Sequence, residues 1–269
     1  DKIPFKRGGE LRDRLVEAVE YLSGRPAPPD HGELKPTLPQ EPAKAASTNL
    51  EGVDLSENAS RTTYQELLRR VDRRAADFHQ QGVKKEQRVL VQLARSAETV
   101  EVFLALLKCG AVVVPCEVSD PIHRLREMAT EVEASYIVGD NALAGVRTLT
   151  LDHLDGLGGT CPDFHQEVAF ILFTSGSTGT PKGVMISHAN ILSLVANMRC
   201  LRLSSDDRVL HCSSLSFDAW FFEVWVTLLY GATVVIHYEN RVTLPGLERV
   251  VTREAVTRAW FTSTLFNLI

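Results

Sequence analysis

The sequence predicts an α/β fold in which layered, mostly parallel sheets carry helices on both faces. From residue 62 onward, short apolar segments alternate with amphipathic segments of helical length, which is the pattern of βαβ units. Several of the short segments, residues 168–173 above all, are apolar throughout. Strands buried on both faces of a sheet read this way. These two observations together predict strands sandwiched between helices.

Composition is that of an ordinary globular protein. The chain has 269 residues, with 44% apolar and 23% charged residues. These values exclude a disordered polymer, a collagen and a disulfide-dense miniprotein, and the length fits one large or two small domains. Lys and Arg number 29 against 34 Asp and Glu, so the formal net charge is −5. A mildly acidic chain argues against nucleic-acid binding, which calls for a basic face.

The apolar runs and the cysteines indicate in which cellular compartment the protein is expected. The longest nearly apolar run, residues 224–236, is shorter than the roughly 20 residues that cross a bilayer. Asp1 opens the chain with no charged-then-apolar leader, so we expect no signal peptide, no membrane partner and a cytoplasmic location. The 5 cysteines include no C-x-x-C pair. We therefore expect reduced, mostly buried thiols rather than disulfides or a zinc site.

Residues 1–60 lack the alternation of strand and helix segments that begins at residue 62. Leu11, Leu15, Val19 and Leu22 recur at helical spacing, which predicts an amphipathic helix within residues 1–24. Many prolines and then a polar stretch follow, so residues 25–60 are expected to form a linker or irregular arm. Residues 61–269 are expected to form the folded lobe.

The elements of the lobe follow in order. Thr63 and Glu66 have capping-box spacing and predict a helix that ends near Gly82. We expect strands at 88–94, 111–115, 136–139, 168–173, 209–212, 232–237 and 258–262, and helices at 100–108, 122–132, 188–200, 219–230 and 245–252. In parallel sheets ligands bind outside the carboxyl ends of the strands. The loops after Phe173, Cys212 and Thr262 are therefore the candidate binding loops.

The loop after the strand at 168–173 is rich in glycine and hydroxyl side chains and contains one lysine. Hydroxyls, backbone N–H groups and an ammonium suit a phosphate ligand, and glycines let the backbone approach it closely. The spacing is not that of a Walker A loop, because the second glycine counted from Gly176 would fall at Pro181. The alternative is a flexible turn. The candidate residues are Thr174, Ser175, Gly176, Ser177, Thr178, Gly179, Lys182 and Gly183.

Residues 173–184, FTSGSTGTPKGV, resemble the signature loop of the adenylate-forming (AMP-binding) superfamily. That group includes acyl-CoA ligases, luciferases and the adenylation domains of nonribosomal peptide synthetases. Residues 63–67, 107–115 and 215–219 resemble further family motifs in the same order. The resemblance covers residues 60–269 and points to the large N-terminal lobe of a synthetase adenylation domain, truncated.

The resemblance implies a reaction. In the family this loop holds the β- and γ-phosphates of ATP while a carboxylate attacks the α-phosphorus, giving an acyl-adenylate and pyrophosphate. By resemblance Thr174, Ser175, Ser177, Thr178 and Lys182 would contact phosphates, and Gly176, Gly179 and Gly183 would permit the backbone path. Mg²⁺ is expected with ATP. The residue that holds it, the ribose-binding Asp and the catalytic Lys are expected beyond residue 269, so the chain alone is expected to be inactive.

Asp218 discriminates between acid substrates. Its apolar neighbours predict a carboxylate that needs a cationic partner, and the matching family Asp binds the α-ammonium of an amino acid. An N-cap role is the alternative. The resemblance places Phe217, Ala219, Phe222 and Phe261 around the substrate, in a pocket like those for branched aliphatic amino acids, although core packing would also explain the phenylalanines.

The expected activity is therefore activation of an amino acid for a carrier-protein domain with phosphopantetheine. The alternatives are an acyl- or aryl-CoA ligase and a non-catalytic truncated remnant. Asp218 separates the first two, because a ligase for simple acids has no ammonium to offer it.

Overall fold

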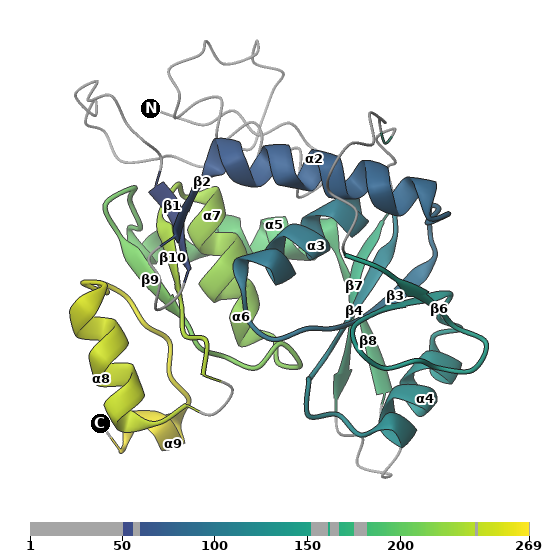
Figure 1. Ribbon diagram of the computed structural model, residues 1–269. Helices are drawn as coiled ribbons and strands as arrows, with labels where there is room; N and C mark the ends of the chain where they lie inside the picture. Colours follow the sequence, from purple (N-terminus) through teal and green to yellow (C-terminus); the bar gives the residue numbers. More distant parts are fainter. Residues whose placement is uncertain are drawn as a thin grey trace. The chain divides into compact units, whose positions relative to one another are not determined.

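The computed structural model describes residues 51–55, 60–151, 161, 167–174, 182–239 and 242–268, with side chains from residue 61 onward except at positions 199 and 200 (Figure 1). The helix expected within residues 1–24 and most of the arm at 25–60 lie outside these ranges. The chain divides into two compact units. The first unit comprises Asp1–Leu67, Ala189–Ser213 and Ala219–Ile269, and the second comprises Leu68–His188 and Ser214–Asp218.

The second unit contains a six-stranded sheet with the order β6-β5-β3-β4-β7-β8. The pairs from β6 to β7 are parallel, and β8 runs antiparallel to β7 at the edge. The strands are β3 (Arg88–Gln92), β4 (Val112–Cys116), β5 (Tyr136–Val138), β6 (Arg147–Leu149), β7 (Val168–Thr174) and β8 (Lys182–Ser187).

Helices cover both faces of this sheet, as predicted. The helices are α3 (Ala97–Lys108) and α4 (Ile122–Glu131), and most of α2 (Tyr64–Gln80) also belongs to this unit. On one face, Leu125 and Met128 of α4 join a buried cluster with Leu90, Val114 and other sheet residues. On the other face, Phe103 of α3 meets Phe170 edge-on, with ring centroids 5.7 Å apart. Burial on both faces explains why the strand segments are continuously apolar.

The first unit contains a four-stranded sheet with the order β2-β1-β10-β9. Its strands are β1 (Glu51–Leu55), β2 (Ser60–Thr63), β9 (Arg208–His211) and β10 (Thr233–Ile236). Its helices are α5 (His188–Asn197), the 3₁₀ turn Met198–Leu201, α6 (Ala219–Phe221), the π-helix Phe222–Val226, α7 (Thr227–Leu229), α8 (Leu244–Arg253) and α9 (Ser263–Phe266). Tyr64, the first residue of α2, connects that helix to the start of β10, because its buried hydroxyl donates to the carbonyl oxygen of Ala232 at 2.7 Å.

Most predicted elements are confirmed to within a few residues. The capping box is confirmed too: the backbone N–H of Glu66 donates to Thr63 Oγ1 at 3.1 Å. The structure differs where an irregular arm was expected, because Glu51–Leu55 pairs with β2 and β10. It also differs at residues 258–262, where only Arg258 forms an isolated bridge, to Val209.

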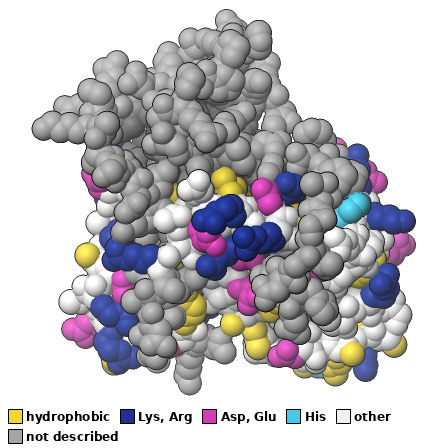
Figure 2. Space-filling model, turned by 45° about the horizontal axis from the view of Figure 1, so that its top comes forward, with side chains coloured by type: hydrophobic (Ala, Val, Ile, Leu, Met, Phe, Trp, Pro, Cys, Tyr) yellow, Lys and Arg dark blue, Asp and Glu magenta, His cyan; other side chains and the backbone are white. Residues whose placement is uncertain are grey.

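The thiols also follow expectation. The described cysteines, Cys109, Cys116, Cys161 and Cys212, are buried thiols. A hydrogen bond with Cys161 and burial raise the pKa of Cys109, and burial raises that of Cys116. These thiols therefore stay protonated at neutral pH. None of the described helices has the length and apolar character that crossing a membrane requires. On the face drawn in Figure 2, basic and acidic side chains are interspersed.

Asp207, which precedes β9, supports a prediction about stability and pH. Burial tends to raise the pKa of its carboxyl group, but hydrogen bonds from Ser204 and Thr257 and the charge of Arg258 outweigh burial and lower it. A carboxyl group whose pKa is lower in the folded state stabilises the fold above its unfolded pKa of about 4, and that stabilisation is lost as the pH falls through the folded pKa. Asp207→Asn should therefore lower the urea midpoint at pH 7, with a smaller difference at pH 3. An equal difference at both values would contradict this assignment.

Candidate nucleotide and substrate site

The phosphate-loop candidate connects β7 to β8. Thr174, the last residue of β7, pairs directly with Lys182, the first residue of β8. The two ends of the loop therefore meet at the carboxyl edge of the second unit's sheet. Both side chains are exposed and available to a ligand. Ser175, Gly176, Ser177, Thr178 and Gly179 lie outside the described residues, so their predicted contacts remain predictions.

Gly183, which the sequence assigned to the loop's backbone path, has a packing role in the structure. A Cβ at this position would lie 2.9 Å from Cγ2 of Ile171, a distance that real Cβ atoms essentially never show. Glycine therefore lets β8 pair with β7 without displacing the side chain of Ile171. The close pairing in turn holds Lys182 opposite Thr174.

The Ser214–Asp218 segment belongs to the same unit and carries two of the predicted substrate residues. Glu117, the residue after β4, anchors it. The hydroxyl of Ser214 donates to Glu117 Oε1 at 2.5 Å, and the backbone N–H of Ser216 donates to the same oxygen at 3.2 Å. The backbone N–H of Phe217 closes the turn on the carbonyl oxygen of Ser214. The segment is thereby fixed to the carboxyl end of β4, the neighbour of β7.

Asp218 departs from expectation. Its carboxylate was expected in apolar surroundings, but Asp218 is exposed, and the side chain of Phe217 is 68% exposed. The reason is local geometry. Helix α6 begins only at Ala219, and the apolar residues that follow it turn inward, whereas Phe217 and Asp218 lie in the preceding turn. The burial argument for an ammonium partner is therefore wrong for this structure, and the role rests on position and resemblance.

The other predicted pocket residues lie in the first unit. Ala219 is half-buried and Phe222 is buried. The ring of Phe222 lies 5.6 Å from that of Trp260, so the helix at 219–229 and the segment at 260–261 are neighbours. Phe261 packs against a buried cluster that includes Leu210 and Leu247. These contacts equally suit the core-packing alternative.

Glu223, to which the sequence assigned no role, is an organising residue of the first unit. Its fully buried carboxylate lies 2.7 Å from Nδ1 of His211. It also accepts hydrogen bonds from the backbone N–H groups of Cys212 and Ser213 and from the Ser213 hydroxyl. The surrounding helix is a π-helix from Phe222 to Val226, a form found often at functional sites. The only sign of this role in the sequence is a glutamate inside an apolar segment, which does not indicate which residues it binds.

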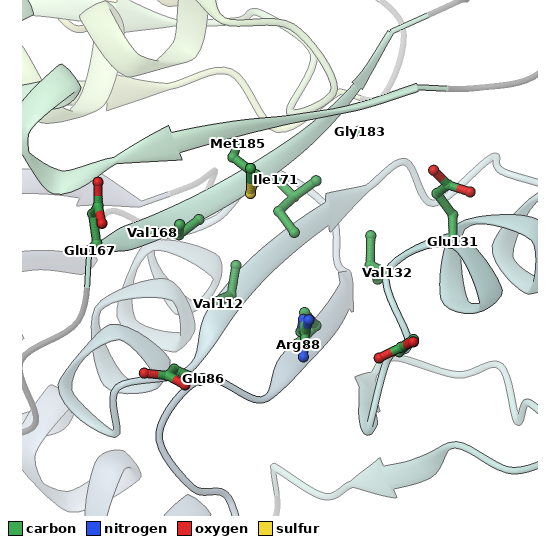
Figure 3. Close-up of a pocket in the computed structure, with 11 residues that line it drawn as sticks. Glu86, Arg88, Val112, Glu131, Val132, Glu167, Val168, Ile171, Gly183 and Met185 are labelled. Atoms are coloured by element: carbon green, nitrogen blue, oxygen red, sulfur yellow. The ribbon is translucent and has the colours of Figure 1, made fainter.

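A pocket of about 520 Å³ lies elsewhere in the second unit (Figure 3). Arg88, Val112 and Val168, which line it, are the first residues of β3, β4 and β7, so it lies toward the amino ends of the strands. Its remaining lining residues include four glutamates, Glu86, Glu131, Glu133 and Glu167. This excess of carboxylates disfavours the phosphates of a nucleotide. The pocket is therefore not the candidate nucleotide site.

Metal ligands were expected beyond residue 269. Within the ranges that the structure describes, no three His, Cys, Asp or Glu side chains come together as a metal-binding group. Thr174 and Lys182 fit a phosphate better than a cation, because they offer a hydroxyl and an ammonium.

Comparison with known proteins is consistent with this geometry. The AMP-binding enzyme family matches residues 39–269, starting earlier than residue 60. Surfactin synthase subunit 2 of Bacillus subtilis is 35% identical over 222 residues, which cover 77% of this chain and 6% of that protein. Malpibaldin synthetase of Mortierella alpina is 34% identical over 244 residues, or 85% of this chain and 4% of that protein. The chain thus spans a small part of these relatives.

Solved structures of adenylation domains also resemble this chain. The N-terminal subdomain of Klebsiella oxytoca NpsA in complex with 3-hydroxyanthranilyl-AMSN matches with a TM-score of 0.79 at 26% identity, over 96% of this chain and 61% of that one. An artificially fused adenylation–PCP di-domain from the same organism, NpsA-ThdA, matches with a TM-score of 0.81 at 25% identity, over 98% and 49% of the two chains. The chain therefore belongs to the AMP-binding, adenylate-forming enzyme family, and within that family it resembles the N-terminal lobe of nonribosomal peptide synthetase adenylation domains.

Proposed function

We propose that this chain takes part in the ATP-dependent activation of an amino acid as its aminoacyl-adenylate, for transfer to a carrier protein. One observation carries the proposal. Thr174 and Lys182, the ends of the phosphate loop, lie at the carboxyl edge of one sheet, and the Ser214–Asp218 segment is bound there to Glu117, the residue after the neighbouring strand β4. An adenylate-forming enzyme needs nucleotide phosphates and substrate carboxylate at one place, and this edge is where parallel sheets bind ligands.

The chemistry is a nucleotidyl transfer. A carboxylate oxygen of the substrate forms a bond to the α-phosphorus of ATP, and the bond from that phosphorus to the pyrophosphate oxygen breaks. Lys182 and Thr174 donate to phosphate oxygens and offset the negative charge of the pyrophosphate. Mg²⁺ bound with ATP supplies further charge neutralisation. The chain's own contribution is positioning and electrostatics rather than a nucleophile.

Asp218 is the residue proposed to select an amino acid. It is an exposed carboxylate at the carboxyl edge of the sheet, accessible to an α-ammonium group. The substrate-facing roles of Ala219 and Phe222, which lie in the first unit, and of an aliphatic substrate such as valine rest on the family resemblance alone. The carrier-protein step is supported by similarity to peptide synthetases and to an adenylation–PCP di-domain.

Activation of an aryl acid is the second candidate. It is favoured by the similar NpsA subdomain, which was solved in complex with 3-hydroxybenzoyl-AMSN. In that case the Asp218 carboxylate would have no ammonium to bind. Asp218 therefore separates the two candidates by experiment.

The test measures pyrophosphate exchange by the full-length protein with valine, 3-methylbutanoic acid and 3-hydroxybenzoic acid. We expect at least about tenfold preference for valine over its des-amino analogue, because a hydrogen bond to a charged group contributes about 1.5–3 kcal/mol. Asp218→Ala should remove most of this preference, and Asp218→Asn should retain part of it through its amide oxygen. Equal use of valine and 3-methylbutanoic acid by the wild type, or preference for the aryl acid, would overturn the amino-acid assignment.

A further inference from the structure

Glu117 is a carboxylate that the proposed chemistry does not use, yet it lies beside both Thr174, where the phosphate loop begins, and the Ser214–Asp218 segment. It directly follows β4, which pairs with β7 through Val113 and Phe170. Counting four residues along each strand from that pair places Glu117 level with Thr174, at the start of the phosphate loop. The same residue anchors the segment that leads to Asp218.

The backbone around Glu117 is itself firmly held. Gln92, buried at the end of β3, donates its amide to the carbonyl oxygens of Glu117 and Val118 at 3.1 and 3.3 Å. The backbone N–H of Glu117 donates to Asp120 Oδ2 at 2.8 Å. Glu117 therefore presents its carboxylate from a rigid support, which a residue that fixes a neighbouring turn requires.

The contact with the turn is specific. One oxygen, Oε1 of Glu117, accepts from both the Ser214 hydroxyl and the Ser216 N–H, and Ser214 Oγ also accepts from that N–H at 3.1 Å. Phe217 and Asp218 come immediately afterwards and have exposed side chains. The turn therefore determines where Phe217 and Asp218 lie, and Glu117 holds the turn in place.

The residue before the turn is held separately. The hydroxyl of Ser213 donates to Glu223 at 2.6 Å within the first unit. Adjacent serines are thus bound by different glutamates, Ser213 by Glu223 and Ser214 by Glu117. Loss of Glu117 would release residues 214–218 while leaving the Ser213 anchor in place.

We propose that Glu117 is a positioning residue for substrate selection: it sets the location of Phe217 and Asp218 relative to Thr174 and Lys182 without touching the substrate. This inference rests on the proposed function of Asp218. It concerns hydrogen-bond acceptance by Oε1, so a glutamine at 117, whose amide oxygen also accepts, should preserve the role, and an alanine should abolish it.

The experiment compares Glu117→Ala and Glu117→Gln with wild type in the full-length protein, by pyrophosphate exchange with valine and 3-methylbutanoic acid. For Glu117→Ala we expect the KM for valine to rise about tenfold and the valine preference to fall about tenfold, since two hydrogen bonds that fix the turn are lost. The KM for ATP should change less than about twofold. Glu117→Gln should lie within about threefold of wild type.

Two further variants separate positioning from general stability. Ser214→Ala removes the other partner of the same hydrogen bond, so its effect should have the same direction and should not add fully to that of Glu117→Ala. Glu101→Gln alters a buried carboxylate that binds Arg74 on α2. It should lower the melting temperature and leave the valine preference unchanged.

The outcomes are distinguishable. If the wild type shows no acid-dependent exchange, or no preference for valine, the proposed function fails and the inference fails with it. If the wild type prefers valine and both Glu117→Ala and Ser214→Ala keep the full preference, the inference alone is overturned. It is also overturned if Glu117→Gln loses as much preference as Glu117→Ala, or if the two KM values rise together.

Discussion

Arg74→Ala should lower the free energy of unfolding by about 3–5 kcal/mol, the cost of leaving a buried charge without its partner. Arg74 on α2 is 2% exposed, and its Nε lies 2.5 Å from the carboxylate of Glu101 on α3, which is 5% exposed. A second contact joins Arg74 to Glu98, which is half exposed. The substitution removes the cation and leaves the Glu101 carboxylate buried. Urea denaturation of the purified protein measures the change.

The matched control removes both charges. Arg74→Met combined with Glu101→Leu replaces the pair with apolar side chains of similar length, and such replacements are often neutral or stabilising. The double variant should therefore be more stable than Arg74→Ala. If Arg74→Ala cost less than about 1 kcal/mol, as is typical of exposed pairs, the buried ion pair would not have the importance that its geometry indicates.

Lys182→Ala should reduce ATP–pyrophosphate exchange by about 10- to 100-fold, because it removes the charge-assisted donor that we propose binds a phosphate. The structure supports a large effect. Pairing with Thr174 fixes Lys182 at the carboxyl edge of the sheet, and the closeness of β7 and β8 at Gly183 maintains that pairing. The KM for ATP should rise more than the KM for the amino acid.

Two variants serve as controls for Lys182. Lys182→Arg keeps the positive charge and should retain more activity than the alanine variant. Lys85→Ala removes an exposed lysine that lies before β3, at the opposite edge of the sheet, where it pairs with Glu86. It should leave exchange unchanged. Equal effects of Lys85→Ala and Lys182→Ala would indicate a response to net charge and contradict a phosphate contact.

Hydrophobic pattern predicted the buried elements of the fold well and the exposed ones poorly. Strand β7 is apolar along nearly its whole length and was predicted almost to the residue. Strand β8 was missed because it lies at an edge and its first four residues are exposed, so its sequence shows no burial pattern. Strand β1 was missed because it is short and follows a proline-rich region. Both strands depend on partners that local sequence does not reveal.

The site was predictable where a local motif encodes it and not where distant residues meet. The glycine, hydroxyl and lysine residues of the loop at 174–183 predict a phosphate-binding role from local sequence alone. The contact between Glu117 and Ser214 joins residues 97 positions apart, and no periodicity predicts it. Asp218 shows a different limit. Its apolar neighbours predicted burial, but the helix begins one residue later, so it lies in a turn and remains exposed.

Identifying the product tests the proposal that this chain serves an enzyme forming aminoacyl-adenylates. The full-length protein is incubated with ATP, Mg²⁺ and equimolar valine and 3-methylbutanoic acid, and the acyl-AMP species are quantified by mass spectrometry. We expect valyl-AMP to be the dominant adenylate and to be lost in Lys182→Ala. Formation of 3-methylbutanoyl-AMP alone, or of no adenylate from a panel of amino acids, would contradict it.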